Sequence, residues 1–326
     1  MRTAVKVEDL KIGMHIILPA SWFSHPFLTN QFTISSHEEI QKIISSGFKE
    51  VEADTHPLEE ETTRPDSDQP HPLNPPQMWE PGKLVPDALR EAIDDKTLSP
   101  EKKATAVYHS SLIIMERLLS DPKAENIRAA KEGITQVVDF IISDDVTAKN
   151  LLTITSYDYY TYTHSVNVGV LSVLLSKEFF KNSYAHDMQE LGAGFFLHDI
   201  GKVHIDPAIL NKPGRLTDNE MTQMKRHPYQ GYKILREAGQ LTEECRIISM
   251  QHHERADGTG YPNQLKEDDI HVYGRICCIA DVYDALTAER PYKQRLTPFE
   301  ALKIMKEQML SHFHKDLFDK FVLLFG

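Results

Sequence analysis

The sequence predicts a mainly α-helical protein, in which a C-terminal helical bundle follows a small α/β domain. Three observations carry this prediction. From about residue 87 onward, apolar residues recur at helical spacing, as at Leu112, Met115 and Leu119. Two segments of this region, 217–220 and 297–300, have the capping-box pattern that begins helices. A proline-rich and acidic segment, 55–86, separates the helical region from the N-terminus and predicts a linker.

The first 54 residues have the pattern of a small α/β domain, which we expect to be regulatory. A strand is predicted over residues 13–18 and a second over 49–53. Between them, Ser35 or Ser36 can cap a helix that carries Ile40 and Ile43 on one face and ends at Gly47. After the linker, residues 87–124 are predicted to form a connecting helix, and residues 125–326 the bundle.

Composition excludes several classes of protein. The 326 residues carry 36 basic and 48 acidic side chains, a net charge of −12, which disfavours binding to a nucleic acid polymer. No apolar run is long enough for a membrane span, and the N-terminus lacks the apolar core of a signal peptide. Three cysteines cannot form a disulfide framework, so we expect a reducing compartment, the cytoplasm. An anionic substrate would need metal ions or a local basic patch.

Histidines and acids in the helical half carry the candidate chemistry. Imidazole and carboxylate together suit divalent first-row metals, and the lack of thiols argues against structural zinc. A carboxylate beside a histidine can bridge two ions, and two ions about 3.5–4 Å apart hold a hydroxide for phosphate-ester hydrolysis. Each histidine alone is more often structural, so the prediction depends on the combination. The candidate ligands are His164, His198, Asp199, His227, His252, His253 and Asp281.

These residues lie in motifs that resemble the HD-GYP family, a subclass of the HD-domain metal-dependent phosphohydrolases. The motifs occur in the family's order, over about residues 125–326, and Gly260-Tyr261-Pro262 is the triplet of the name. The N-terminal unit resembles a small domain of unknown function that often precedes HD-GYP domains in bacterial proteins. The matching stretches are His198-Asp199-Ile200-Gly201-Lys202, His227-Pro228-Tyr229-Gln230-Gly231, residues 252–262, residues 281–287 and Arg290-Pro291-Tyr292-Lys293.

The resemblance implies a phosphodiesterase that hydrolyses cyclic di-GMP, a bacterial second messenger, to pGpG and often on to GMP. It implies a bundle that holds two or three non-haem ions, iron or manganese being the usual candidates. One ion would be bound by His164, His198, Asp199 and Asp281. Asp199 would bridge to the other ion, which His227, His252 and His253 would complete.

Further roles follow from the same resemblance. Lys202 would donate to the scissile phosphate or the leaving oxygen, and Arg290 and Lys293 would contact substrate phosphate, for which a guanidinium is well suited. Asp284, three residues after Asp281, either orients a ligand or is a helix-surface acid. The Gly260-Tyr261-Pro262 loop would shape the rim of the site or dock a partner such as a diguanylate cyclase.

The number of ions depends on one position. Some family members have a glutamate four residues before the first histidine ligand, where it helps to hold a third ion. Here that position is Tyr160, a neutral phenol and a poor ligand for a hard ion. We therefore expect two ions rather than three, and accumulation of pGpG.

Other functions stay open at this stage. One is a cyclic-dinucleotide receptor or scaffold of HD-GYP shape with little catalysis, although the complete ligand set favours an enzyme. Another is a hydrolase of a different cyclic dinucleotide, since base choice depends on groups that the motifs do not include.

Overall fold

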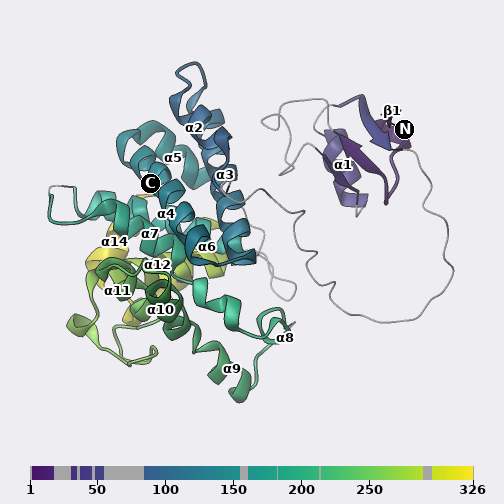
Figure 1. Cartoon of the computed structure of the whole chain (residues 1–326). Coiled ribbons are helices and arrows are strands. Elements are labelled where there is room, and N and C mark those ends of the chain that lie inside the picture. Colours follow the sequence, from purple (N-terminus) through teal and green to yellow (C-terminus); the bar gives the residue numbers. More distant parts are fainter. Residues whose placement is uncertain are drawn as a thin grey trace. The chain divides into compact units, whose positions relative to one another are not determined.

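The computed structural model describes residues 2–17, 31–34, 37–45, 48–54, 84–154, 161–181, 183–212, 214–288 and 296–325. The chain divides into two compact units, Met1–Asn74 and Pro75–Gly326 (Figure 1). The division falls within the proline-rich segment 55–86.

The described residues of the N-terminal unit form an antiparallel four-stranded sheet in the order β1-β4-β2-β3, with one α-helix. Side chains that alternate toward one face, such as Ile16, Val51 and Ala53, form its core with Ile43 of the helix. The structure adds strands β1 and β3 to the two strands and the helix that the sequence predicts. The elements are β1 (Arg2–Lys6), η1 (Val7–Asp9), β2 (His15–Ile17), β3 (Gln31–Thr33), α1 (His37–Ser45) and β4 (Glu50–Asp54).

Helices and no strands occur in the described residues of the second unit, as predicted. Its helices before the candidate site are α2 (Asp87–Asp94), α3 (Pro100–Ser120), α4 (Ala124–Ser143), α5 (Asp145–Ile154), α6 (Thr161–Phe179) and α7 (Met188–Leu197). They continue with η3 (Ile200–His204), α8 (Pro207–Leu210), α9 (Asp218–Met224), α10 (His227–Glu237), α11 (Glu243–Gln251) and η4 (Glu267–Asp269). The last are α12 (Val272–Thr287), α13 (Pro298–Gln308), η5 (Leu310–His312) and α14 (Lys315–Leu323).

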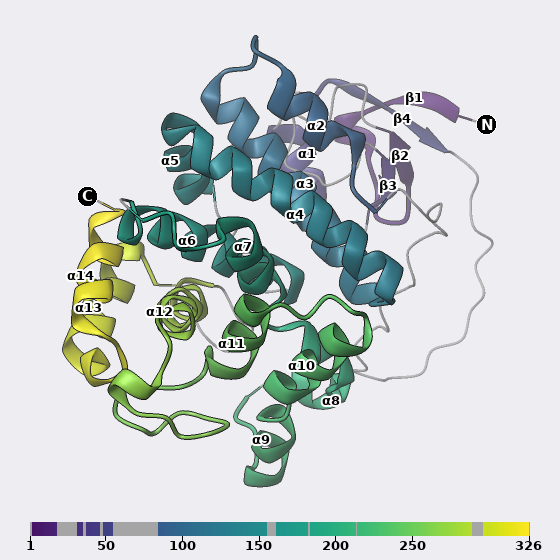
Figure 2. The same ribbon diagram turned by 60° about the vertical axis from the view of Figure 1, so that its left-hand side comes forward.

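Helices α6 and α12 form the centre of this unit. Every residue of α6 from Thr163 to Ser176 is buried, which is the pattern of a helix that is covered on all sides. It packs against α3, α7 and α12, while α12 also contacts α11, α13 and α14. In Figure 2, α12 is seen almost end-on, with the other helices around it. The candidate ligands on α6 and α12 therefore lie in the interior.

Local sequence signals define several helix boundaries. Both predicted capping boxes are confirmed: Thr217 begins α9 and Thr297 begins α13, each paired reciprocally with the glutamate three residues later. Residues 87–124, predicted as one connecting helix, contain two, because Ser99 caps a new helix whose first residue is Pro100. Both pack within the helical unit, where α3 contacts α4, α5 and α6.

The three cysteines, Cys245, Cys277 and Cys278, are free and buried, as expected of core residues. No described helix has the length and apolarity that a membrane span requires.

Candidate metal centre

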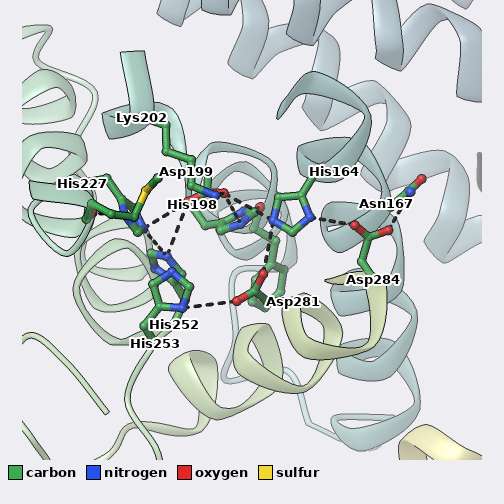
Figure 3. Close-up of polar contacts among 12 residues, drawn as sticks. His164, Asn167, His198, Asp199, Lys202, His227, His252, His253, Asp281 and Asp284 are labelled. Carbon is green, nitrogen blue, oxygen red and sulfur yellow. Dashed lines mark hydrogen bonds and ion pairs between the residues drawn. The ribbon is translucent and has the colours of Figure 1, made fainter. Parts of the chain in front are cut away.

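All seven predicted ligands lie together at the centre of the helical unit (Figure 3). Five helices supply them. His164 is on the first turn of α6, and Asp281 is on α12. His198 and Asp199 follow the end of α7, His227 begins α10, and His252 and His253 follow the end of α11. Residues far apart in the chain thus meet because the ends of α6, α7, α10 and α11 converge on the middle of α12.

The seven side chains form two groups that could each hold an ion. One consists of Asp199, His227, His252 and His253, and the other of His164, His198 and Asp281. Within each group the candidate ligand atoms lie within 4.8 Å of one another. Imidazole nitrogens and carboxylate oxygens are the donors that divalent transition metals accept.

Asp199 lies between the two groups. Its Oδ2 is 3.3 Å from Nε2 of His164 and 3.4 Å from Nε2 of His198. Its Oδ1 is 3.2 Å from Nε2 of His227 and 3.7 Å from Nε2 of His252. Each oxygen of one carboxylate therefore faces a different group, which is the arrangement of a bridging ligand.

Asp281 makes a second connection between the groups. Its Oδ1 is 3.2 Å from Nε2 of His164, and its Oδ2 is 3.3 Å from Nδ1 of His253. The two acids thus stand among five histidines in a buried space.

Backbone carbonyls fix the tautomers of three histidines. Nδ1 of His198 lies 2.8 Å from the carbonyl of Phe195, and Nδ1 of His227 lies 2.8 Å from that of Met224. Nδ1 of His252 lies 3.0 Å from the carbonyls of Ile248 and Ser249. A carbonyl only accepts, so each Nδ1 carries the proton and each Nε2 presents a lone pair to the centre.

These lone pairs fit a cation. Nε2 of His227 and Nε2 of His252 are 3.1 Å apart, although neither has a proton to donate to the other in this tautomer. Nε2 of His198 is buried without a hydrogen-bond partner. Buried acceptors that face one another are costly unless a positive charge lies between them, so this donor set fits divalent ions.

The electrostatics agree with this donor set. Burial lowers the pKa of His227 well below its ordinary value and, with the neighbouring His252, lowers the pKa of His253 to about 4, so both are neutral. Burial alone would raise the pKa values of Asp199 and Asp281. The charge of Lys202, together with contacts with His198 and His164, nevertheless holds the pKa of Asp199 well below its usual range. Contacts with His164 and His253 do the same for the pKa of Asp281.

His164 differs from the other histidines. Burial opposes its protonation, but hydrogen bonds to Asp199, Asp281 and Asp284 raise its pKa well above the ordinary value. Its Nδ1 lies 2.7 Å from Oδ2 of Asp284. Asp284 is buried, which excludes the helix-surface alternative, and it contacts a candidate ligand.

The predicted phosphate-binding residues are only partly described. The ammonium of Lys202, one turn after the His-Asp pair, contacts Oδ2 of Asp199 at the edge of the centre. Arg290, Lys293 and Tyr160 lie outside the described residues, so their predicted roles stay predictions.

Gly201 allows two motifs to meet. A Cβ atom at this position would lie 2.0 Å from the carbonyl oxygen of His227 and 2.4 Å from the nitrogen of Gly231. The turn that follows Asp199 therefore rests directly on the first turn of α10. This close approach brings Asp199 beside His227.

The Gly260-Tyr261-Pro262 loop covers one side of the centre. The ring of Tyr261 lies 4.6 Å from the ring of His253, and its backbone nitrogen donates to the carbonyl of His253. The buried carboxylate of Glu254 accepts hydrogen bonds from the backbone nitrogens of Asn263 and Leu265, at 2.6 and 3.0 Å. The loop thus shapes the rim, one of its two predicted roles.

Sequence reasoning missed three residues of this site. Glu254 anchors the loop, and Tyr108 and Asn167 continue the contacts of His164 through Asp284. Asn167 could have been found, because it lies three residues after His164 on the same helix face. Tyr108 had no such signal, since its partner is 59 residues away.

Comparisons with known proteins agree with this geometry. Residues 181–317 match the family described as HD domain, and residues 2–132 match a domain of unknown function, DUF3391. A cyclic di-GMP phosphodiesterase of Pseudomonas aeruginosa is 31% identical over 331 residues, which cover 100% of this chain and 77% of that protein. The match to DUF3391 extends through α2 and α3 into α4.

Two further relatives and one structure are similar over different lengths. A cyclic di-GMP phosphodiesterase response regulator of Xanthomonas campestris is 44% identical over 113 residues, 34% of this chain and 30% of that protein. A 3'3'-cGAMP-specific phosphodiesterase of Vibrio cholerae is 44% identical over 122 residues, 37% of this chain and 23% of that protein. An HDG"Y"P protein from Bdellovibrio bacteriovorus shares the fold, with a TM-score of 0.64, 19% identity and full coverage of both chains.

Proposed function

The chain belongs to the HD-GYP family of HD-domain phosphodiesterases, and we propose that it hydrolyses cyclic di-GMP at the centre described above. The observation that carries the proposal is the position of Asp199, whose two oxygens face two separate groups of histidines. Such an arrangement suits two ions, which is the usual device for hydrolysis of phosphate esters.

The residues present divide the work. His164, His198 and Asp281 would hold one ion, and His227, His252 and His253 the other, with Asp199 shared between them. When bound, the two ions supply the Lewis-acid chemistry of phosphodiester hydrolysis. Iron or manganese is our proposal for their identity, since both accept these ligands.

Cations of the chain itself would position the substrate. Lys202 lies against Asp199, close enough to the centre to donate to the scissile phosphate or the leaving oxygen. Arg290 and Lys293, between α12 and α13 in the sequence, would bind the other phosphate oxygens. Together with the ions they offset the chain's net charge of −12 around a dianionic substrate.

The ring of cyclic di-GMP would open to pGpG, which we expect to accumulate. The phenol at position 160 is the reason, because it is a poor third ligand for an additional ion. Three free and buried cysteines favour a reducing compartment, and we propose the cytoplasm. Diguanylate cyclases remain our proposed partners for the Gly260-Tyr261-Pro262 loop.

A second substrate is favoured by one observation. The relative from Vibrio cholerae named a 3'3'-cGAMP-specific phosphodiesterase is as similar over its aligned segment as the relatives named for cyclic di-GMP. The motif residues of this chain are assigned to phosphate and metal rather than to the bases. One adenine in place of guanine is therefore the alternative to test.

The test uses the full chain, purified without oxygen. Metal content is measured on the same sample that is then incubated with cyclic di-GMP or 3'3'-cGAMP, and products are separated by chromatography. We expect two ions per chain and early pGpG from cyclic di-GMP. Faster turnover of 3'3'-cGAMP would move the proposal to that substrate, and binding without turnover would favour a receptor.

A further inference from the structure

A line of buried polar side chains leads away from the metal centre. His164 contacts Asp284 through Nδ1, and the other oxygen of Asp284 accepts a hydrogen bond from Nδ2 of Asn167 at 2.7 Å. Oδ1 of Asn167 in turn accepts a hydrogen bond from the hydroxyl of Tyr108, also at 2.7 Å (Figure 3 shows the first three residues). The line joins α6, α12 and α3.

Every hydrogen bond in this line has one possible direction. An amide oxygen only accepts, so the hydroxyl of Tyr108 must donate to Asn167. This contact turns the amide nitrogen of Asn167 toward Asp284, which is acceptor-only when ionised. Asp284 then uses its remaining oxygen to accept the proton of His164 Nδ1. Nε2 of His164, which faces Asp199 and Asp281, is thereby the nitrogen that can exchange its proton for a metal ion.

The line is buried along its whole length. The exposed fractions are 3% for Tyr108, 2% for Asn167, 4% for Asp284 and 3% for His164. Polar groups at such depth are costly unless they are paired, and paired networks hold their members in one orientation. Hydrogen bonds of this kind behind a metal ligand orient the imidazole and raise its basicity.

His164 is held differently from three other histidines of the centre. His198, His227 and His252 are fixed by carbonyls three or four residues earlier in the chain. His164 depends on a residue of α12 and, through it, on Asn167 and a residue of α3. A displacement of α3 therefore has a direct hydrogen-bonded route to this ligand.

We propose that Tyr108 and Asn167 are positioning residues of the metal centre, acting through Asp284 to hold His164 as a neutral Nε2 ligand. The inference rests on the proposed function in one respect, that ions bind at this centre. Through Tyr108, helix α3 becomes part of the metal site. Because α3 lies within the match to DUF3391, residues 2–132, that domain contributes a side chain to the site.

The test measures metal binding without substrate. The metal-free full chain is titrated with Co²⁺, and both the affinity and the visible spectrum of the bound ions are recorded. Tyr108→Phe removes only the hydroxyl, and Asp284→Asn removes the charge that faces His164. Tyr273→Phe is the matched control, because its hydroxyl pairs with His186 and not with a ligand.

We expect Asp284→Asn to lower the affinity for one of the two Co²⁺ ions by about ten- to a hundredfold. Tyr108→Phe should lower the same affinity by a smaller factor, about three- to tenfold. Tyr108→Phe should also change the Co²⁺ spectrum, and it should lower the metal-free unfolding midpoint by a few degrees, because the buried Oδ1 of Asn167 loses this hydrogen bond. In the double variant the two losses should not multiply, because Tyr108 acts through Asp284.

Three results would overturn the inference. They are a wild-type spectrum and affinity in Tyr108→Phe, the same changes in Tyr273→Phe, or losses that multiply in the double variant. A wild-type chain that binds two Co²⁺ ions but does not cleave cyclic di-GMP would refute the proposed substrate alone. A wild-type chain that binds no Co²⁺ would refute both.

Discussion

The two halves of the metal centre are built in different ways. His227 is oriented by the carbonyl of Met224, the last residue of α9, and His252 by carbonyls of its own helix α11, all within four residues in the chain. On the other side, His198 is held by the nearby carbonyl of Phe195, but His164 is oriented by a side chain of α12, 120 residues away. The carbonyl contacts of the first half form within the segment from α9 to α11, whereas the contact of His164 requires α6 and α12 to pack, and its continuation to Tyr108 requires α3. We therefore expect substitutions outside the motifs to affect the His164 half more.

The largest effect is expected where the halves join. Asp199→Ala removes the carboxylate whose two oxygens face the two groups, so both ions should be lost. Metal catalysis of this kind is worth several kcal/mol, so turnover should fall by about a thousandfold or more. Metal analysis, an activity assay and circular dichroism on one sample provide the check, and helical content should stay near wild type. Full metal occupancy with normal turnover would show that Asp199 is not the bridge.

Gly201→Ala should break the half that depends on local structure. The added methyl group cannot fit against the carbonyl of His227, so the turn must move away from α10 and carry Asp199 with it. Overpacking of this kind costs about 1–3 kcal/mol of stability. Calorimetry should show a lower unfolding midpoint, and metal analysis a reduced ion content. Gly239→Ala, where the Cβ would meet nothing within 4 Å but φ is +65°, controls for strain alone.

Lys202→Ala and Arg290→Ala should leave both halves occupied but slow the reaction. Loss of a charge-assisted contact to phosphate costs about 1.5–3 kcal/mol, or roughly ten- to a hundredfold in rate. For Lys202→Ala there is a second consequence, because this ammonium lowers the pKa of Asp199. The variant should release its metal at a higher pH than wild type during acid titration. Equal metal loss in both variants at neutral pH would place them among the ligands.

The pH dependence of the metal-free protein should separate the halves. The pKa of His253 is lowered to about 4 and that of His227 also lies below 6.5, so the unfolded chain binds more protons than the folded chain. Below pH 6.5 the free energy of unfolding should therefore fall, by up to about 3 kcal/mol for His253. His164 has the opposite sign, because its pKa is raised and its contribution is lost as the pH rises. Denaturant titrations of His164→Asn should show the alkaline loss removed and the acid loss retained.

Removal of the N-terminal unit should have the smallest effect on the chemistry. We expect residues 84–326 to fold and to hydrolyse the substrate, with altered regulation at most. The fragment begins at Leu84 because that side chain is 1% exposed and its carbonyl accepts from Arg117. A fragment that begins at residue 125 loses Tyr108 and should be impaired. Comparison of the two by metal analysis and activity tests where the catalytic unit begins.

The candidate ligands could be predicted from sequence because most of them lie in compact motifs. His198 and Asp199 are adjacent, as are His252 and His253. The helices between the motifs could be predicted because their apolar residues recur at helical spacing and capping residues mark where several of them begin. Of the four strands, the sequence predicted β2 and β4 but not β1 and β3. Strand β3 has three residues and too little alternation to be recognised. Tyr108 could not be found, because its role depends on how α3 packs against α6. Tyr261 lies on His253 through a loop path that residue types alone do not define.

The three buried thiols bear on how this protein responds to oxidants. Burial raises the pKa of Cys278 to about 12 and also raises the pKa values of Cys245 and Cys277, so each is a protonated thiol at neutral pH. Thiols in this state react slowly with peroxide and with alkylating reagents. If air inactivates the enzyme, the cause is then a change of valence or loss of its ions. Dithiothreitol alone should fail to restore such a sample, whereas reduction together with fresh ferrous or manganous ion should succeed.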